Sequence, residues 1–64
     1  MESMLNKEEI ERAKICIVNI EDKMASIKTE IVNTDKPYKP YLLEKLKSIF
    51  YDVNCLINMC GGDE

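Results

Sequence analysis

Three cysteines, Cys16, Cys55 and Cys60, are the side chains of this sequence with the widest chemistry. A zinc site needs four ligands at regular spacings, whereas this sequence has no histidine and joins Cys55 to Cys60 by a step that matches no zinc motif. An odd cysteine number also fits poorly with a disulfide-stapled secreted domain. We therefore predict no metal, no cofactor and reduced thiols in a cytoplasmic protein. Cys16 and Cys60 are expected to be buried as small apolar groups, and Cys55 to lie on the polar side.

Carboxylates are plentiful, but nothing in the sequence pairs them for catalysis. The chain has 12 acidic residues and lacks histidine, a glycine-rich phosphate loop and a nucleophile beside a base. Glu44 and Asp52 are expected to be solvated. A two-helix protein also offers no concave pocket of its own. We therefore predict that the protein is not an enzyme.

The tandem triplet "KPYKPY", residues 36–41, invites two interpretations. Tyr38 and Tyr41, beside Lys36 and Lys39, have the composition of an interface hot spot, so they are possible contacts to a partner. In the alternative, the prolines only bend the chain between two helices, and one ring covers the apolar end of the hairpin.

The charge balance restricts the class of partner. Nine basic and 12 acidic residues give a net charge of -3, and the signs are mixed along the chain. Direct nucleic-acid binding normally needs a clustered basic face, so it is disfavoured. No stretch is apolar for the 18 or so residues of a membrane span, and none has the pattern of a signal peptide.

A long amphipathic helix is predicted over about residues 6–33. Asn6 is a favourable N-cap, and Glu9 stands three residues later, as in a capping box. The apolar residues that follow recur at alternating steps of three and four, the a/d spacing of a coiled coil. This predicted seam consists of Ile10, Ala13, Ile17, Ile20, Met24, Ile27 and Ile31.

A turn is expected over residues 34–39, and a second helix over about 40–60, with Pro40 in its first turn. Residues 61–64 are expected to form a frayed tail. The apolar residues of the second helix again step by four and three: Leu42, Leu46, Ile49, Val53, Leu56 and Cys60, with Leu43, Phe50 and Ile57 widening the stripe. Residues 1–64 are therefore expected to form one all-α domain, an antiparallel two-helix hairpin.

The open end of this hairpin should place the run Ile15–Val18 beside Cys55–Cys60. Four consecutive apolar residues point around most of a helix, so one neighbouring helix cannot cover them all. A core this small also seldom stabilises a chain alone. We therefore predict a homodimer, a four-helix bundle whose second chain covers this end. The predicted interface residues are Ile15, Cys16, Ile17, Val18, Leu56, Ile57, Met59 and Cys60.

The stretches "MLNKEEIERAK" and "YLLEKLKSI", residues 4–14 and 41–49, resemble small helical proteins encoded by phages and mobile elements of Gram-positive bacteria. Many such proteins act by binding a host protein, and some inhibit bacterial immune systems. The resemblance implies a stoichiometric inhibitor or modulator of a host protein, for example in phage-encoded anti-defence. The alternative from the residues themselves is a structural or assembly adaptor that acts through oligomerisation.

A second resemblance concerns "SIFYD", residues 48–52. It is similar to part of the Spo0E-like aspartyl phosphatases, small antiparallel helix pairs with the signature Ser-Gln-Glu-Leu-Asp. Only Ser48 and Asp52 match, and Phe50 stands in place of the acidic residue. Phosphatase activity is therefore disfavoured.

Overall fold

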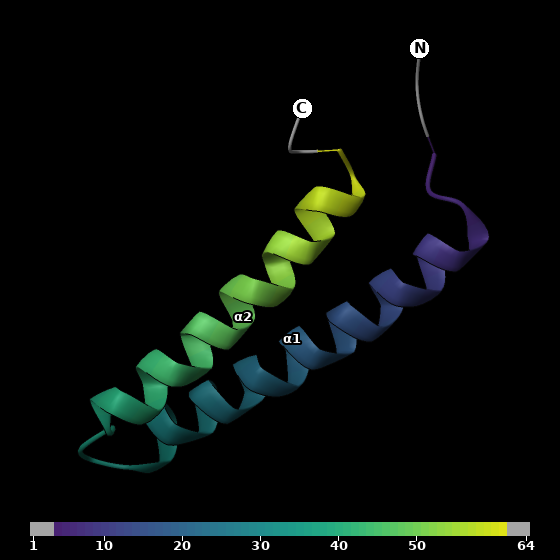
Figure 1. Cartoon of the computed structure of the whole chain (residues 1–64). Coiled ribbons are helices and arrows are strands. Elements are labelled where there is room, and N and C mark those ends of the chain that lie inside the picture. Colours follow the sequence, from purple (N-terminus) through teal and green to yellow (C-terminus); the bar gives the residue numbers. More distant parts are fainter. Residues whose placement is uncertain (1–3, 62–64) are drawn as a thin grey trace.

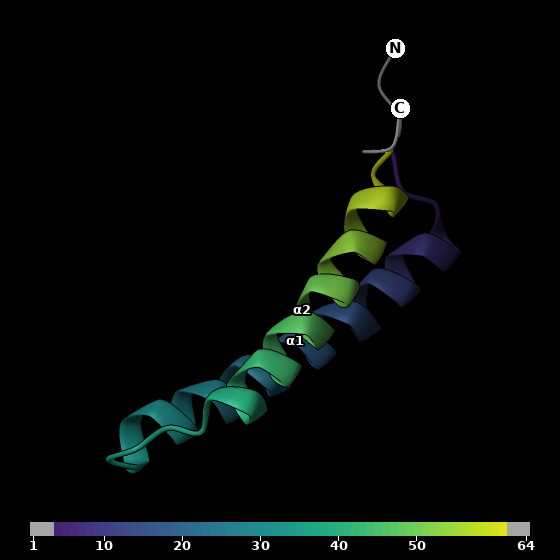
Figure 2. The same ribbon diagram turned by 60° about the vertical axis from the view of Figure 1, so that its left-hand side comes forward.

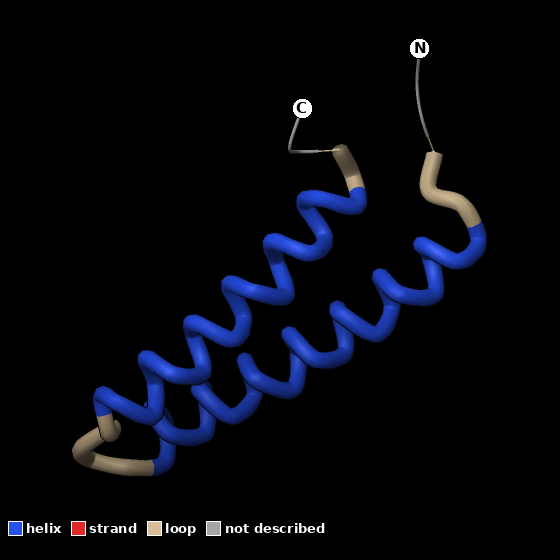
Figure 3. The backbone as a smooth tube through the Cα atoms, in the orientation of Figure 1, coloured by secondary structure: helices blue, strands red, loops and turns tan. Residues whose placement is uncertain are grey.

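The structure is a computed structural model that describes residues 4–61. It consists of two helices, α1 (Lys7–Asn33) and α2 (Lys39–Met59), which run antiparallel and are joined by the turn 34–38 (Figure 1). Figure 3 shows that the remainder of the described chain is loop. The predicted all-α hairpin is thus confirmed for these residues, and α2 begins one residue earlier than the sequence indicated.

Helix α1 begins with the predicted capping box. The Asn6 side-chain oxygen accepts the Glu9 backbone N–H at 2.8 Å, and the Glu9 carboxylate accepts the Asn6 backbone N–H at 3.0 Å. The two interactions satisfy donors that have no partner within the helix. Glu8 and Glu9 also place negative charge at the positive end of the helix dipole.

The turn is held to the end of α1 by Glu30. Its Oε2 accepts the backbone N–H of Tyr38 at 2.9 Å, and its main-chain carbonyl accepts the Thr34 hydroxyl at 3.1 Å. Tyr38 is the N-cap of α2, and Pro40 follows in the first turn, where its missing N–H costs nothing. The "KPYKPY" stretch therefore includes both the bend and the start of α2.

Helix α2 ends at a left-handed residue. Cys60 is the C-cap, and Gly61 follows with φ of 81°. A glycine at this position is the usual way to end a helix, because it carries no Cβ to clash in the left-handed region. The tail predicted after Gly61 lies outside the described residues.

The hairpin is a thin plate. Its principal extents are 50 × 21 × 14 Å, as expected for two long helices side by side. Helix α1 packs against α2, and a turned view shows a single layer of two helices (Figure 2). Ile27 is the only hydrophobic side chain in residues 4–61 that is buried. Large apolar side chains therefore remain exposed along both helices.

The side of α1 that faces α2 is rotated from the predicted seam. Every second seam residue remains about half exposed: Ile10, Ile17, Met24 and Ile31, at 41, 46, 50 and 52%. The other seam residues, Ala13, Ile20 and Ile27, are half-buried or buried. Their companions on the contact line are Cys16, Lys23 and Glu30, which are also half-buried. The hairpin therefore covers one flank of the apolar stripe of α1.

Helix α2 is rotated in a similar way. Its contact line with α1 runs along Lys45, Asp52 and Met59, flanked by Leu42, Ile49 and Leu56, all of them half-buried except Asp52, which is buried. The rest of the predicted stripe is exposed: Leu43, Leu46, Phe50, Val53, Ile57 and Cys60. Packing of α1 against α2 therefore leaves an exposed apolar flank on each helix.

Candidate functional site

A buried ion pair crosses the hairpin near its middle. Lys23 Nζ donates to Asp52 Oδ2 at 2.6 Å, and Asp52 is only 7% exposed, the single buried charged residue of the described chain. The expectation that Asp52 is solvated is therefore wrong, because the contact line of α2 is rotated onto the position it occupies. Glu44 is exposed as expected. The pair marks the register in which the two helices pack.

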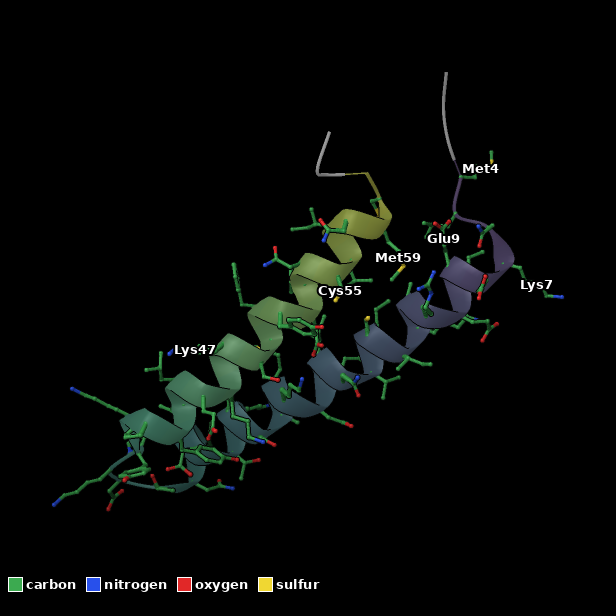
Figure 4. All side chains as sticks on the ribbon, in the orientation of Figure 1. Met4, Lys7, Glu9, Lys47, Cys55 and Met59 are labelled. Carbon is green, nitrogen blue, oxygen red and sulfur yellow. The ribbon has the colours of Figure 1, made fainter. Side chains whose placement is uncertain are left out.

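With Lys23 opposite Asp52, a step of seven residues back along α1 and forward along α2 places Cys16 opposite Met59. These two residues line a cleft between the helices at the open end of the hairpin, with a volume of about 540 Å³. In Figure 4, Cys55 and Met59 point from α2 toward α1 across this space. The open-end cleft is defined by Glu9, Arg12, Ile15, Cys16, Cys55, Asn58 and Met59.

The open-end cleft combines a cation with apolar walls. Arg12 is the only arginine of the sequence, and Ile15 beside it is 62% exposed. Arginine next to an exposed apolar anchor is the composition of a protein-binding hot spot. Glu9 is engaged in the capping box of α1. The cleft can therefore bind a partner through apolar contacts with Ile15 and hydrogen bonds from Arg12.

All three cysteines are free thiols, but their environments differ from the predicted ones. Cys16 is half-buried in the open-end cleft. Cys60, expected to be buried, is exposed, because it is the C-cap residue one position after Met59 and lies about 100° around the helix from the contact line. Cys55 lies on the polar side as expected, but it is half-buried there and lines the cleft.

The apolar run Ile15–Val18 divides among several directions, as four successive helical residues must. Ile15 and Cys16 line the open-end cleft together with Met59. Ile17 and Val18 do not, and they are 46 and 53% exposed. On α2, Leu56 is half-buried while Ile57 is 46% exposed. The eight predicted interface residues therefore do not form one patch.

The two turn tyrosines have separate surroundings. Tyr41 is half-buried and lines a shallow depression on α1 with Ala25, Ser26, Thr29 and Glu30. Lys45 Nζ lies 5.4 Å from the centre of its ring, within cation–π range. Tyr38 is 65% exposed. One ring thus covers the end of the hairpin, as one of the two interpretations of the turn expects, and the other remains free for a partner.

Spacing alone did not reveal a surface along the side of the plate, which we call the lateral apolar face. It comprises Ile10, Ile17, Met24 and Ile31 of α1 and Leu46 and Val53 of α2, all between 36 and 52% exposed. Leu43, Phe50 and Ile57 lie about 140–180° around α2 from Asp52 and are exposed at its outer edge. The apolar periodicity contains the signal for the lateral apolar face. What the sequence could not provide is the rotation of each helix, which decides which flank of a stripe the partner helix covers.

The described residues were also compared with the requirements of a metal site and of a membrane-spanning helix. Within residues 4–61, no three cysteine, aspartate or glutamate side chains gather closely enough to hold a metal ion. Neither α1 nor α2 combines the length and the apolar character that crossing a membrane requires.

No family model matches this chain, and comparisons with curated proteins and with solved structures found no match either.

Proposed function

We propose that this protein is a small non-enzymatic interaction module that binds a bacterial host protein in fixed stoichiometry and inhibits or modulates it. The observation that carries the proposal is the balance of apolar surface. Only Ile27 is a buried hydrophobic residue in the described part of the chain, whereas large apolar side chains are exposed along both helices. Contiguous exposed apolar surface of this kind usually marks a binding site.

The open-end cleft is the proposed site for the host protein. Its apolar walls can hold an inserted side chain, and Arg12 can bind a carboxylate or carbonyl at the rim. Ile15, which is 62% exposed, provides apolar area that a partner would remove from water. Tyr38 at the opposite end is a second possible contact, since its ring is free.

The proposal also covers self-association of the chain and its cellular role. A single layer of two helices has no second layer to cover it, and most domains bury their apolar faces between two layers. We propose that two copies form a four-helix bundle. The resemblance to phage and mobile-element proteins supports a cytoplasmic role such as anti-defence.

The experiment is capture of host proteins on the immobilised chain under reducing conditions, with quantitative mass spectrometry. We expect one protein to be captured in fixed stoichiometry. Arg12→Ala should reduce its recovery at least about tenfold, because truncating a hot-spot arginine costs well over about 1 kcal/mol of binding free energy. Lys14→Ala is the matched control. It removes one positive charge two residues away, from an exposed pair with Glu11 outside the cleft, and should change recovery less than about threefold.

A second candidate function is a structural or assembly adaptor, which the lateral apolar face favours because that face suits oligomerisation. In that case the capture experiment would return only further copies of the chain. Equal recovery of a host protein with Arg12→Ala and with the unchanged chain would instead move the partner site away from the open-end cleft.

A further inference from the structure

The lateral apolar face is continuous across both helices. On each helix the exposed apolar residues are displaced from the contact line in the same rotational sense. Successive residues are about 100° apart around a helix, so steps of four forward or three back both rotate by a small angle in one sense. In α1 such steps lead from the contact residue Ile20 to Met24 and Ile17. In α2 they lead from Ile49 and Leu56 to Val53. Each apolar flank is therefore displaced from its contact line in the same rotational sense.

Equal rotation places both flanks on one side of the plate. Two antiparallel helices are related by an approximate two-fold axis perpendicular to the plane that contains them. This axis preserves the sense of rotation, so residues displaced in the same sense emerge on the same face. Steps in the opposite sense lead from Ile20 to Cys16 and Lys23, and then to Arg12 and Ser26. The hairpin therefore has one apolar face and one polar face, and Arg12 places the open-end cleft on the polar side.

From this arrangement we infer that the lateral apolar face binds the same face of a second copy, across a two-fold axis. The inference rests on the proposed self-association and assigns its surface. It shares Ile17 with the interface that the sequence predicts but leaves out Ile15, Cys16 and Met59, which line the open-end cleft and lie away from this surface.

The amount of exposed surface fits a second copy. The chain exposes 5509 Å², whereas a compact folded chain of 7.4 kDa is expected to expose roughly 4200 Å². The excess of roughly 1300 Å² is spread over the whole elongated chain, and it exceeds the roughly 800 Å² that each partner contributes to an interface of standard size. A second plate laid on the first would also supply the missing second layer.

The composition of the face points to the same occupant. Its six residues are all apolar, and Glu21 and Lys28 border it on α1, so the complementary surface must be apolar along the centre of the face. Ile10, Ile17, Met24 and Ile31 recur every seven residues, the repeat with which helices interdigitate in bundles. A second copy offers two antiparallel helices with this repeat and the same chemistry. Two-fold homodimers are also the commonest assemblies.

The arrangement leaves the polar face free. Because the open-end cleft lies on that side, a dimer formed through the lateral apolar face would carry two clefts facing solvent. Self-association and host binding would then use different surfaces of one small chain. An open-end interface would instead cover Ile15 and Met59, and the two functions would compete.

Sedimentation equilibrium under reducing conditions tests the inference by comparing substitutions at two adjacent residues, one on the lateral apolar face and one off it. The unchanged chain should have twice its mass of 7.4 kDa at micromolar concentration. Ile17→Glu puts a charge in the lateral apolar face and should raise the dimer dissociation constant at least about thirtyfold. Val18→Glu is the matched control, since Val18 is 53% exposed against 46% for Ile17 but points elsewhere. It should change the constant less than about threefold.

Methyl NMR on the unchanged sequence avoids the risk that a variant fails to fold. Chains with 13C-methyl methionine are mixed with unlabelled chains, and contacts between labelled and unlabelled copies are recorded. Met24 lies on the lateral apolar face and Met59 in the open-end cleft. We expect contacts between copies at Met24 and none at Met59.

The outcomes separate the two proposals. A monomer at all concentrations overturns self-association and this face together, and leaves host binding to be decided by the capture experiment. A dimer that shows its contacts at Met59, and that dissociates with Ile15→Glu but not with Ile17→Glu, keeps self-association and overturns the lateral face.

Discussion

Lys23 on α1 and Asp52 on α2 form an ion pair of 2.6 Å whose carboxylate is buried, and this pair lies on the line along which the two helices touch. Charge normally avoids such a position unless it is paired. In this register, Lys23 of α1 faces Asp52 of α2. The pair also places charged rather than apolar groups at the centre of the intramolecular contact.

Lys23→Met should destabilise the hairpin strongly. The substitution keeps most of the aliphatic stem but leaves the Asp52 carboxylate buried without its partner, which costs about 2–4 kcal/mol. This approaches the whole stability expected of a core this small, so helicity measured by circular dichroism should fall at a markedly lower urea concentration.

The pair between Lys14 and Glu11 provides the control. Its atoms are 3.6 Å apart and both side chains are about two-thirds exposed. Lys14→Met should therefore change the free energy of unfolding by less than about 1 kcal/mol. Equal losses from Lys14→Met and Lys23→Met would show that burial gives the Lys23 pair no special role.

Replacing both members of the buried pair should recover much of the loss. In Lys23→Met with Asp52→Leu, no charge is left without a partner, and two apolar side chains of similar length can pack in its place. We expect the double variant to regain at least half of the stability lost in Lys23→Met alone, measured by urea unfolding. Losses that simply add would indicate that the two side chains are not energetically coupled.

The sequence predicts the elements of this fold well because their signals are local. The capping box of Asn6 and Glu9, the steps of three and four, and the proline in the first turn of α2 each depend on residues a few positions apart. The contact between the helices is different in kind. Apolar spacing locates a stripe on each helix, but the rotation of that stripe depends on the other helix.

Ile17 and Asp52 illustrate what this rotation changes. Ile17 belongs to the predicted seam and is 46% exposed, while Asp52, predicted to be solvated, is 7% exposed. From residue type and spacing, Ile17 is expected to be more buried than Asp52. The pairing of Lys23 with Asp52 reverses that ranking, and a contact between residues 29 positions apart leaves no trace in local periodicity.

The turn tyrosines should separate stability from binding. Tyr41 is half-buried against α1, with Lys45 over its ring, so Tyr41→Ala should lower the free energy of unfolding by about 1–2 kcal/mol. Tyr38 is 65% exposed, so Tyr38→Ala should cost less than about 0.5 kcal/mol. Thermal unfolding of the two variants side by side measures both. The assignment fails if Tyr38→Ala proves the more damaging change.

The end of α2 allows a test of backbone conformation alone. Gly61 has φ of 81°, and a Cβ added there would meet nothing within 4 Å, so only the backbone opposes a side chain. Gly61→Ala should therefore cost about 1 kcal/mol, the penalty of an L-residue in the left-handed region. The mirror-image residue suits this conformation, and D-alanine at position 61 should match glycine or stabilise by up to about 1 kcal/mol, because it restricts the unfolded chain. Chemical synthesis gives access to all three chains, and urea unfolding followed by circular dichroism compares them. Equal stability of the L-alanine and D-alanine chains would mean that the left-handed end contributes nothing to the stability of α2.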